Sequence, residues 1–409
     1  MSMFTIWTAH GPAATGRSKN MADMFFGYMR PDGKVGSRNY VAVVPSVVCA
    51  NEVAEAISNQ VMNCRPLLHH QGCCQLPPDL ERVTDTLISL ACHPNAGAVL
   101  VVSLGCEGTD VDRLLEAVAK SGKPYDIVRI QEIGGTANAI AEGIKKAQRL
   151  SMAISGLQRE PFDLTHFVMG IKCGGSDATS GLASNCAIGY VADKIVDQGG
   201  TVMFGEVTEF IGAEHILARR ARTPEVGEKI LKLVDAMETR AKSLGCDMRK
   251  GQPTPGNIAG GLTTIEEKSL GAIMKSGSRT IEGVLEYPEM SAGKGGLWIK
   301  DTPGREIEIL TGMAAGGAQC ITFSTGRGAP QGFPILPVIK ICGNPNTYER
   351  MSNDMDLNAG LIIQGKSSIE EVGEVLYQKL LRTLSGEQCK GESIYYSKSM
   401  DIYCMGPVI

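Results

Sequence analysis

The chain has 409 residues, of which 43% are hydrophobic and 21% charged, and its formal net charge is -4 at pH 7. At roughly 150 residues per domain, this length predicts two or three domains with large apolar cores. The slightly acidic balance argues against nucleic acid as a partner, because no positive field gathers phosphates, and no apolar run reaches the roughly 18 to 20 residues of a membrane helix.

The N-terminal segment and the cysteines both bear on the compartment in which the chain works. Residues 1–26 read as a disordered lead-in. They lack an early basic cluster and a continuous apolar stretch, so they do not resemble a secretory signal, and Met21 is an alternative start. Thirteen cysteines, an odd number spread over a long chain, are not the pattern of a small secreted disulfide scaffold. We expect reduced thiols and a cytoplasmic protein.

Apolar runs rich in valine and isoleucine alternate with amphipathic stretches from residue 39 to about residue 158. The runs VAVVPSVV, AVLVVSLG and DIVRI have the length of buried strands, whereas VDRLLEAVAK and TANAIAEGIKKAQRL have helical spacing. This alternation predicts an α/β fold in which helices cover both faces of a parallel sheet in Rossmann-like layers. We assign residues 27–160 to this first α/β domain.

A second α/β pattern begins with HFVMGIKCGG and continues to the end of the chain. We expect a helix over residues 178–198, a strand at TVMFGEV, and two long helices over residues 212–221 and 224–244. Strands and helices alternate again from EIEILTGMAAGGAQCITFSTG onwards. Residues 161–409 are therefore assigned to a second α/β domain.

Two parts of this second domain depart from the regular alternation. Residues 250–304 are rich in proline, glycine and lysine and have few sustained apolar runs, so we interpret them as an inserted loop or lid that a site could use. At the C-terminus, ESIYYS and DIYCMGPVI are expected to form short closing strands.

Ligands of open α/β sheets bind outside the carboxyl ends of the strands, so polar residues that directly follow predicted strands are the best candidates for a site. Four segments satisfy this condition: residues 69–75 (HHQGCCQ), 105–108 (GCEG), 172–177 (KCGGSD) and 342–346 (CGNPN).

The segment HHQGCCQ combines two of the six histidines of the chain with paired thiols, which are good ligands for iron or another first-row metal. Its spacing matches no closed zinc module, because a second pair of ligands at the usual interval is missing. His69 or His70 could bind metal or transfer a proton. The alternative is a histidine whose hydrogen bonds are satisfied within a turn.

Two other strand-end segments each allow a functional and a structural interpretation. Glu107 beside Cys106 could be a metal ligand or a base, or a carboxylate that caps the following helix. Lys172 could neutralise a carboxylate that approaches the glycines after it, although many glycine-rich turns only change the chain direction.

Further carboxylates, amides and a guanidinium complete the set of candidates. Glu206 and Glu209 follow a predicted strand, and residues 353–358 are dense in Asp and Asn, which suits a hard cation, a polyhydroxy substrate or simply a solvated turn. Arg327 lies in a glycine-flanked turn and could bind a carboxylate or a sulfonate through two hydrogen bonds.

Five sequence segments occur together in one order: GYMRPDGKVGSRNY, LGCEG, KCGGSDATSG, LTGMAAGGAQ and the tail FSTGRGAPQGFPILPVIKICGNPNTYERMSNDMDLNAG. From about Gly27 to the C-terminus, the chain resembles altronate and galactarate dehydratases on these segments. Several separate motifs in the same order make the resemblance more specific than any one of them.

The resemblance implies an elimination that depends on ferrous iron (Fe2+), with Mn2+ as the alternative metal. A proton leaves the carbon next to the carboxylate of a small 2-hydroxy acid, and a β-substituent departs. The family includes the large subunit of (2R)-sulfolactate sulfo-lyase, from which sulfite leaves instead of water. We therefore expect conversion of (2R)-3-sulfolactate to pyruvate and sulfite; the alternative is dehydration of a sugar acid to a 2-keto-3-deoxy acid.

The resemblance also bears on partners. The single-chain dehydratases have an extra N-terminal domain that has no counterpart before Gly27. This implies a split enzyme in which a small partner subunit supplies the missing domain, and an oligomeric assembly. Two other classes are disfavoured: a nicotinamide oxidoreductase lacks its G-x-G-x-x-G turn here, and a non-catalytic scaffold would have no reason to keep Cys, His and Glu at strand ends.

The strand-end positions and the resemblance together give a set of expected site residues. Catalytic roles are expected for His69, His70, Glu107 and Lys172; metal ligation for His70, Cys106, Cys173 and Glu206; and substrate binding for Ser176, Asp177, Arg327 and Asn344.

Overall fold

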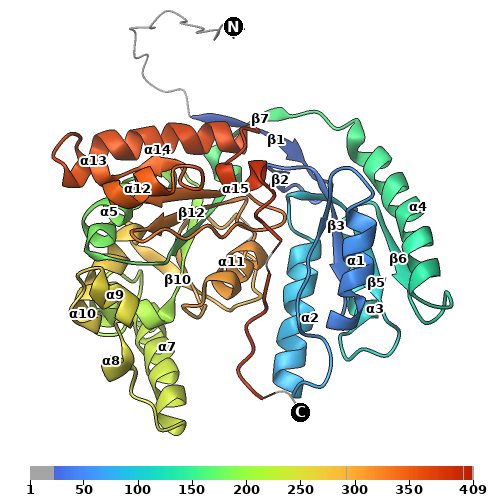
Figure 1. Cartoon of the computed structure of the whole chain (residues 1–409), viewed down its shortest axis with the longest axis horizontal. Helices are drawn as coiled ribbons and strands as arrows, with labels where there is room; N and C mark the ends of the chain where they lie inside the picture. The colour runs from blue at the N-terminus through green and yellow to red at the C-terminus, as the bar shows by residue number, and fades with distance from the viewer. Residues whose placement is uncertain (1–22, 292, 399, 408–409) are drawn as a thin grey trace, which may run out of the picture.

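The first sheet of the computed structural model is four-stranded and parallel, in the order β4-β3-β5-β6; the structure describes residues 23–291, 293–398 and 400–407. Its strands are β3 (Tyr40–Pro45), β4 (Cys64–Pro66), β5 (Ala96–Ser103) and β6 (Tyr125–Arg129). Helices α1 (Asn51–Ser58) and α4 (Thr136–Ser155) cover one face, and α2 (Pro77–Ala91) and α3 (Val111–Lys120) cover the other (Figure 1). β5 is buried along its whole length, which explains its uninterrupted apolar sequence.

The second sheet has seven parallel strands in the order β10-β11-β9-β8-β12-β13-β14. They are β8 (Val168–Cys173), β9 (Thr201–Phe204), β10 (Ile281–Leu285), β11 (Gly296–Lys300), β12 (Cys320–Thr325), β13 (Val338–Cys342) and β14 (Leu357–Asn358). The central strands are buried on both faces, as expected for a parallel sheet covered by helices.

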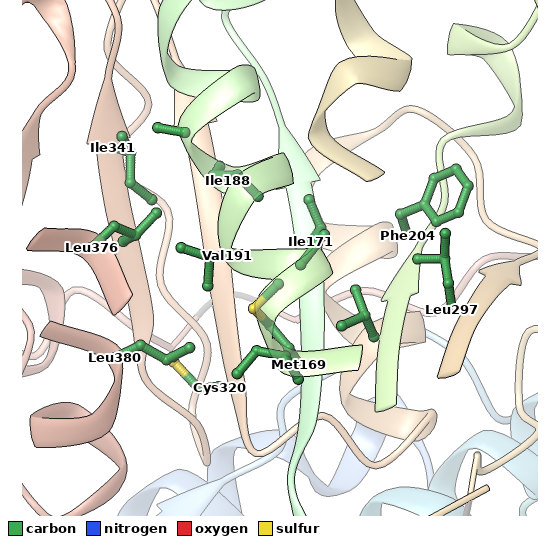
Figure 2. Packing of buried hydrophobic residues seen from close by; sticks show 14 of the residues in the cluster. Met169, Ile171, Ile188, Val191, Phe204, Leu297, Cys320, Ile341, Leu376 and Leu380 are labelled. Atoms are coloured by element: carbon green, nitrogen blue, oxygen red, sulfur yellow. The ribbon is translucent and has the colours of Figure 1, made fainter. Parts of the chain in front are cut away.

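Helices cover both faces of this seven-stranded sheet. On one face lie α5 (Asn185–Asp197) and α14 (Ile369–Leu384); Figure 2 shows Met169 and Ile171 of β8 packed among Ile188 and Val191 of α5. On the other face lies α11 (Glu306–Ala315), whose apolar residues share one buried cluster with α2 of the first sheet. The two sheets are therefore joined through a common core.

The remaining described helices are α6 (Glu214–Arg219), α7 (Pro224–Ser243), α8 (Met248–Gly251), α9 (Pro255–Ala259), α10 (Ile265–Ile273), α12 (Pro345–Arg350), α13 (Gly360–Ile363) and α15 (Lys390–Ser393). A small antiparallel sheet in the order β2-β1-β7 joins β1 (Met24–Met29), β2 (Val35–Gly36) and β7 (Glu160–Asp163). No described helix is long and apolar enough to span a lipid bilayer.

The α/β fold with parallel sheets is confirmed, and the structure adds detail to the expected elements. The expected helix over residues 178–198 contains a π turn, Ser180–Ser184, that continues into α5. Most of the expected lead-in lies outside the described residues, but its last residues belong to β1, which pairs with β7.

Residues 250–304, expected to be an inserted loop or lid, contain helices and two strands of the main sheet. β10 is an edge strand of the seven-stranded sheet, and β11 lies between it and β9. Their sequences are short, and each contains glycine and a half-buried alternation rather than a continuous apolar run. Short strands without a continuous apolar run are difficult to recognise in a sequence, because their pattern resembles that of a loop.

The expected closing strands at the C-terminus are wrong. The first of the two expected strands, ESIYYS, instead begins inside α15. Residues 400–406, which we call the C-terminal strap, pair with no strand in the described structure. The backbone N–H groups of Met405 and Gly406 instead donate to the carboxylate of Asp79 on α2, at 2.8 and 2.6 Å. The Asp79 carboxylate thus satisfies two backbone N–H groups that a neighbouring strand would otherwise have paired.

Each of the two parallel sheets has a topological switch point. After β3 the chain adds β4 on one side and then β5 on the other; after β8 it adds β9 on one side and later β12 on the other. Loops diverge at such points, and ligands bind there, outside the carboxyl ends of the strands.

Candidate active site

A cluster of buried charges lies at the carboxyl ends of β8 and β9. Its members are Lys172 and Cys173 at the end of β8, Glu206 and Glu209 after β9, and Lys275 in the turn after α10. Each of these residues is at most 5% exposed. Buried charges at this density require mutual compensation, so the contacts within this buried charge cluster decide its state.

The ammonium of Lys275 is the centre of this cluster. Its Nζ lies 3.0 Å from Cys173 Sγ and 2.9 Å from Glu209 Oε2, and it also pairs with Glu206. Lys172 pairs with the other oxygen of Glu206, while the thiol of Cys173 donates to Glu209 Oε2 at 2.7 Å. Two ammonium groups thus balance two carboxylates.

The pKa directions agree with this balance. Burial alone would raise the pKa of Glu209, but Lys275, Lys268 and Lys172 lower it to about 2. Burial would lower the pKa of Lys275, yet the neighbouring Cys173 and carboxylates raise it well above its ordinary value. Burial and the same carboxylates raise the pKa of the Cys173 thiol. At neutral pH the carboxylate of Glu209 and the Lys275 ammonium are charged and the thiol is protonated.

The backbone at Glu206 is held in a left-handed conformation, with φ of 72°. Its N–H donates to Thr302 Oγ1 at 2.9 Å, and its carboxylate accepts from the backbone N–H of Cys173 at 2.9 Å. Such a conformation costs of order 1 to 3 kcal/mol for a residue other than glycine and is typical of functional sites. It directs the carboxylate back toward the end of β8.

Three donors of the cluster could hold a metal ion. Ligand atoms of Cys173, Glu206 and Glu209 lie within 4.8 Å of one another. A thiol with two carboxylates is a donor set that suits a first-row divalent metal such as iron. Because the Lys275 ammonium contacts all three donors, an ion can bind there only if Lys275 moves away.

A second charged group lies on the first sheet, where the C-terminal strap reaches His70. His70 Nδ1 is 2.5 Å from Asp401 Oδ1, and Arg305 Nη1 is 3.0 Å from Asp401 Oδ2. The other ring nitrogen of His70, Nε2, lies 2.7 Å from the amide nitrogen of Gln71. This pattern assigns the ring proton to Nδ1 and leaves Nε2 as an acceptor.

Accessibility separates the two members of this His70–Asp401 pair. The side chain of His70 is 54% exposed, whereas that of Asp401 is 5% exposed. The carboxylate is held from behind by Arg305, and the imidazole faces solvent. An exposed imidazole oriented by a buried carboxylate is an arrangement suited to proton transfer.

The first turn of α11 lies between the buried charge cluster and the His70–Asp401 pair. Glu308 accepts a hydrogen bond from Arg305 at 3.0 Å. Burial and the nearby Asp401 raise the pKa of Glu308, although Arg305 and His70 oppose the shift. Burial likewise raises the pKa of Glu306, and the pKa stays above its ordinary value although Lys172 opposes the shift. A side chain at Gly174 would lie 2.4 Å from the Glu306 carboxylate, so any larger residue there would displace that carboxylate.

Comparison with known proteins assigns the family. Residues 164–406 match the description "D-galactarate/Altronate dehydratase, C-terminal", and residues 27–155 match "D-galactarate dehydratase/Altronate hydrolase, second domain". The chain belongs to the galactarate/altronate dehydratase family. It is thereby an enzyme of the lyase class.

Curated relatives in this family differ in name and in coverage. The (2R)-sulfolactate sulfo-lyase subunit beta of Chromohalobacter salexigens is 39% identical over 374 residues, which are 90% of this chain and 95% of that protein. The altronate dehydratase of Bacillus subtilis is 34% identical over 373 residues, 89% of this chain and 74% of that protein. The galactarate dehydratase (L-threo-forming) of Escherichia coli is 34% identical over 386 residues, with 89% and 73% covered.

Within this dehydratase-family chain, the structure brings together some of the expected site residues. Lys172, Cys173 and Glu206 are in direct contact in the buried charge cluster. His70 and Cys106 lie at the edge of the first sheet instead, and in the part of the chain that the structure describes they do not join the three-donor group. The expected metal ligands therefore fall at two places.

His69 points into the first domain rather than to solvent. Its Nε2 donates to the carbonyl oxygen of Pro45 at 2.8 Å, and its Nδ1 accepts from the backbone N–H of Gln71 at 3.2 Å. Both ring nitrogens are therefore used within the loop, and the side chain holds the turn that presents His70.

The burial of His69 predicts a loss of stability in mild acid. Its pKa is lowered from 6.5 to about 4, chiefly because burial disfavours the imidazolium. As pH falls from 6.5 toward 4, the unfolded chain binds a proton at His69 that the folded chain does not bind. This lowers the free energy of unfolding by about 2 kcal/mol at about pH 5. Urea unfolding at about pH 7.5 and about pH 5 should show a smaller loss for His69→Gln than for wild type. Equal losses would contradict this prediction.

Glu107 braces the turn after β5. Its carboxylate accepts from Ser46 Oγ at 2.5 Å and from the backbone N–H of Gly105 at 2.6 Å. Burial raises its pKa, but hydrogen bonds from Ser103 and Ser46 outweigh this and lower it. Beside it, the exposed thiol of Cys106 accepts from the amide of Gln131 at 3.2 Å.

The expected substrate-binding residues meet at the carboxyl ends of β8, β12 and β13. Asp177 caps the following helix by accepting from the Ser180 N–H at 3.1 Å, and its other oxygen accepts from Asn344 at 3.0 Å. Arg327 is exposed, and its N–H donates to Gly175 O at 2.8 Å.

A cavity of about 490 Å³ opens beside this group. Ser176, Asp177, Asn185 and Lys268 line it together with apolar side chains of α10. Its volume is typical of a small-molecule site.

Sequence reasoning missed Lys275, Arg305 and Asp401. Lys275 lies in the region expected to be a loop, yet it follows the apolar helix end GAIM, and a lysine beside a buried helix end could have indicated a buried charge. Asp401 had no usable signal, because its partner is more than 300 positions away and the strap was expected to be a strand.

Proposed function

We propose that the chain is the large, catalytic subunit of a lyase that removes the C3 substituent of a small 2-hydroxy acid, with (2R)-3-sulfolactate as the substrate. The observation that carries this proposal is the match to a sulfo-lyase subunit beta at 39% identity over 95% of that protein. Altronate and galactarate dehydratases match at 32 to 34% identity, so dehydration of a sugar acid is the second candidate.

The reaction begins at the carbon next to the carboxylate. In the proposed mechanism, the substrate displaces the Gln71 amide from His70 Nε2, which then accepts the proton from C2. The electron pair of the broken C–H bond forms the C2–C3 double bond. The C–S bond breaks, sulfite leaves with its electron pair, and the enol tautomerises to pyruvate. In the second candidate reaction, water leaves from C3 and a 2-keto-3-deoxy acid forms.

Charged side chains near His70 provide the polar environment that this step needs. Asp401 would hold the imidazole and stabilise it while it carries the proton. Arg305, with a side chain that is 62% exposed, would contact the substrate carboxylate. From the second sheet, Ser176, Asp177, Arg327 and Asn344 remain the proposed contacts for the rest of the substrate, with Glu107 and Lys172 as further proposed catalytic groups.

The proposed metal is Fe2+, with Mn2+ as the alternative. Cys173 and Glu206 are proposed ligands and Glu209 completes the set, because their donor types and spacing fit such an ion. Cys106 stays a proposed ligand at the other edge; His70 is a ligand there only in place of its role as the base, because one ring nitrogen cannot serve both. A bound divalent ion supplies a positive charge that stabilises the enolate-like negative charge developing next to the carboxylate.

A small partner subunit, an oligomeric assembly and a cytoplasmic location are part of the proposal. The word subunit in the name of the sulfo-lyase relative supports a partner chain. All thirteen cysteines are free thiols, which supports a reducing compartment.

Product analysis tests the proposed function. The chain, with its small partner and ferrous iron, is incubated anaerobically with sulfolactate, altronate and galactarate in parallel. We expect sulfite and pyruvate in equal amounts from sulfolactate, because one C–S bond breaks for each pyruvate formed. A 2-keto-3-deoxy acid from a sugar acid, without sulfite from sulfolactate, would select the dehydratase instead. Failure of all three substrates would contradict both candidates.

A further inference from the structure

Exposed thiols gather at one edge of the first sheet. Five of the thirteen cysteines are exposed, and four of these lie at the carboxyl edge of the four-stranded sheet. We call them the edge thiols: Cys49 follows β3, Cys73 and Cys74 follow β4, and Cys106 follows β5. Cysteine is among the residues most often buried, so four exposed thiols at one sheet edge need a cause other than packing.

The loops that carry the edge thiols are joined to one another by backbone hydrogen bonds. The N–H of Val48 donates to Gln71 O at 3.0 Å, and the N–H of Gly108 donates to Gly72 O at 2.9 Å. Thr109 Oγ1 adds a bond to Ser46 O at 2.7 Å. Each edge thiol lies within three residues of one of these bonds, so the three loops converge over the switch point between β3 and β5.

The backbone at this edge is shaped for close approach. Gly72 has φ of 106°, and a side chain there would lie 2.5 Å from Ser46 O. Cys74 adopts a left-handed backbone with φ of 52°, although it is not a glycine. The sulfur atoms of Cys73 and Cys74 are 3.6 Å apart. Close packing does not explain a strained backbone at an exposed cysteine beside a second thiol, so the strain points to a function.

The spacing of these thiols distinguishes between kinds of metal site. Over the described residues, the donor group compact enough for a single ion is the buried trio of Cys173, Glu206 and Glu209, so the edge thiols are too widely spaced for one ion. An iron–sulfur cluster contributes its own iron and sulfide and therefore bridges thiolates that are farther apart. Thiolates are also the ligands that such clusters prefer.

We propose that the edge thiols hold an iron–sulfur cluster, with one thiolate from each of the three loops. Each thiol loses a proton when it binds iron, and no electron transfer is needed for this step. Three protein ligands would leave one iron of a four-iron cluster without a thiolate, and the loop that carries Cys73 also carries His70. That iron would bind the hydroxyl and carboxylate of a 2-hydroxy acid; this last point rests on the proposed function, whereas the cluster itself does not.

Iron and sulfide contents test the cluster directly. The chain and single variants are reconstituted anaerobically with ferric iron, a thiol reductant and sulfide, then desalted and assayed for iron, acid-labile sulfide and visible absorption. Wild type should retain stoichiometric iron and sulfide, and Cys106→Ser and Cys49→Ser should each lose at least about fivefold of the sulfide. Of Cys73→Ser and Cys74→Ser, at least one should show the same loss. Cys246→Ser, the exposed cysteine away from this edge, is the matched control and should equal wild type.

Two outcomes would overturn the cluster. Wild type that retains iron without labile sulfide would indicate a mononuclear ion, and Cys106→Ser with the sulfide content of wild type would remove the proposed ligand set. Far-ultraviolet circular dichroism of each variant establishes that a loss of sulfide does not reflect unfolding. Turnover of sulfolactate by cluster-free protein would refute the role of the open iron and leave the lyase function standing.

Discussion

Replacing His70 by asparagine should lower kcat on the preferred substrate by roughly two to four orders of magnitude, the usual contribution of a positioned general base. Asparagine keeps a polar side chain near Asp401 but has no group that accepts a proton near neutral pH. Steady-state kinetics on the wild type and the variant, with equal metal loading, measure the effect. His166→Asn, at an exposed histidine, is the control and should leave kcat unchanged.

The geometry allows a sharper version of this test. The Gln71 amide donates to Nε2, so the ring proton lies on Nδ1, 2.5 Å from Asp401 Oδ1, and Nε2 acts as the base once the substrate displaces that amide. In Asp401→Asn the amide can donate to Nδ1 instead and impose the wrong tautomer, so kcat should fall by about two to four orders of magnitude while KM changes little. A fall through loss of structure would instead affect KM and the free energy of unfolding. Wild-type kcat in His70→Asn would refute the assignment of His70 as the base.

Much of the candidate site could be predicted because parallel strands place their carboxyl ends at one edge. Lys172 and Glu206 meet because β8 and β9 are neighbours in register, with Ile171 opposite Phe204. The alternation of strands and helices is visible in the sequence, and the rule that ligands bind at the carboxyl ends of strands then selects the segments that meet at these sheet edges. Their roles as ligands, bases or substrate contacts remain predictions.

The order of strands within each sheet could not be predicted from the same pattern. The expected metal ligands fell at two places because residues 40–129 and residues 168–358 build separate parallel sheets, each with its own switch point. Periodicity reports burial along one element, but it carries no information on which distant elements become neighbours. Asp401 reaches His70 only because the C-terminal strap crosses to α2 and is held there by Asp79.

α11 explains why the two charged groups belong to one region despite this separation. Its apolar residues fill the core between the two sheets, and its first turn carries Glu306 toward Lys172 and Glu308 toward Arg305. A helix fixed by burial on this scale holds both carboxylates in place without extra contacts. Movement of the two parallel sheets relative to each other would therefore change both groups together.

Replacing Lys275 by methionine should lower the free energy of unfolding by about 3 to 5 kcal/mol, because it leaves the Glu209 carboxylate buried without the ammonium that pairs with it. Methionine has a similar shape to lysine, so the change removes charge more than volume. Urea unfolding of wild type and variant at neutral pH measures the difference. Lys232→Met, at an exposed lysine 2.8 Å from Glu228, removes a surface pair and should cost at most about 1 kcal/mol.

A second substitution separates charge from packing in this prediction. Glu209→Gln in the Lys275→Met background removes the unpaired carboxylate, so it should recover roughly 0.5 to 3 kcal/mol of the loss. Acid provides an independent check. The pKa of Glu209 is lowered from 4.5 to about 2, with burial opposing the shift and Lys275 the largest cause of it. Its contribution to wild-type stability is present above pH 4.5 and disappears as pH falls toward 2, so the difference between wild type and Lys275→Met should shrink over that range. A difference below about 1 kcal/mol at neutral pH, or one that stays constant into acid, would mean that the Lys275 ammonium is not what keeps the Glu209 carboxylate charged inside the protein.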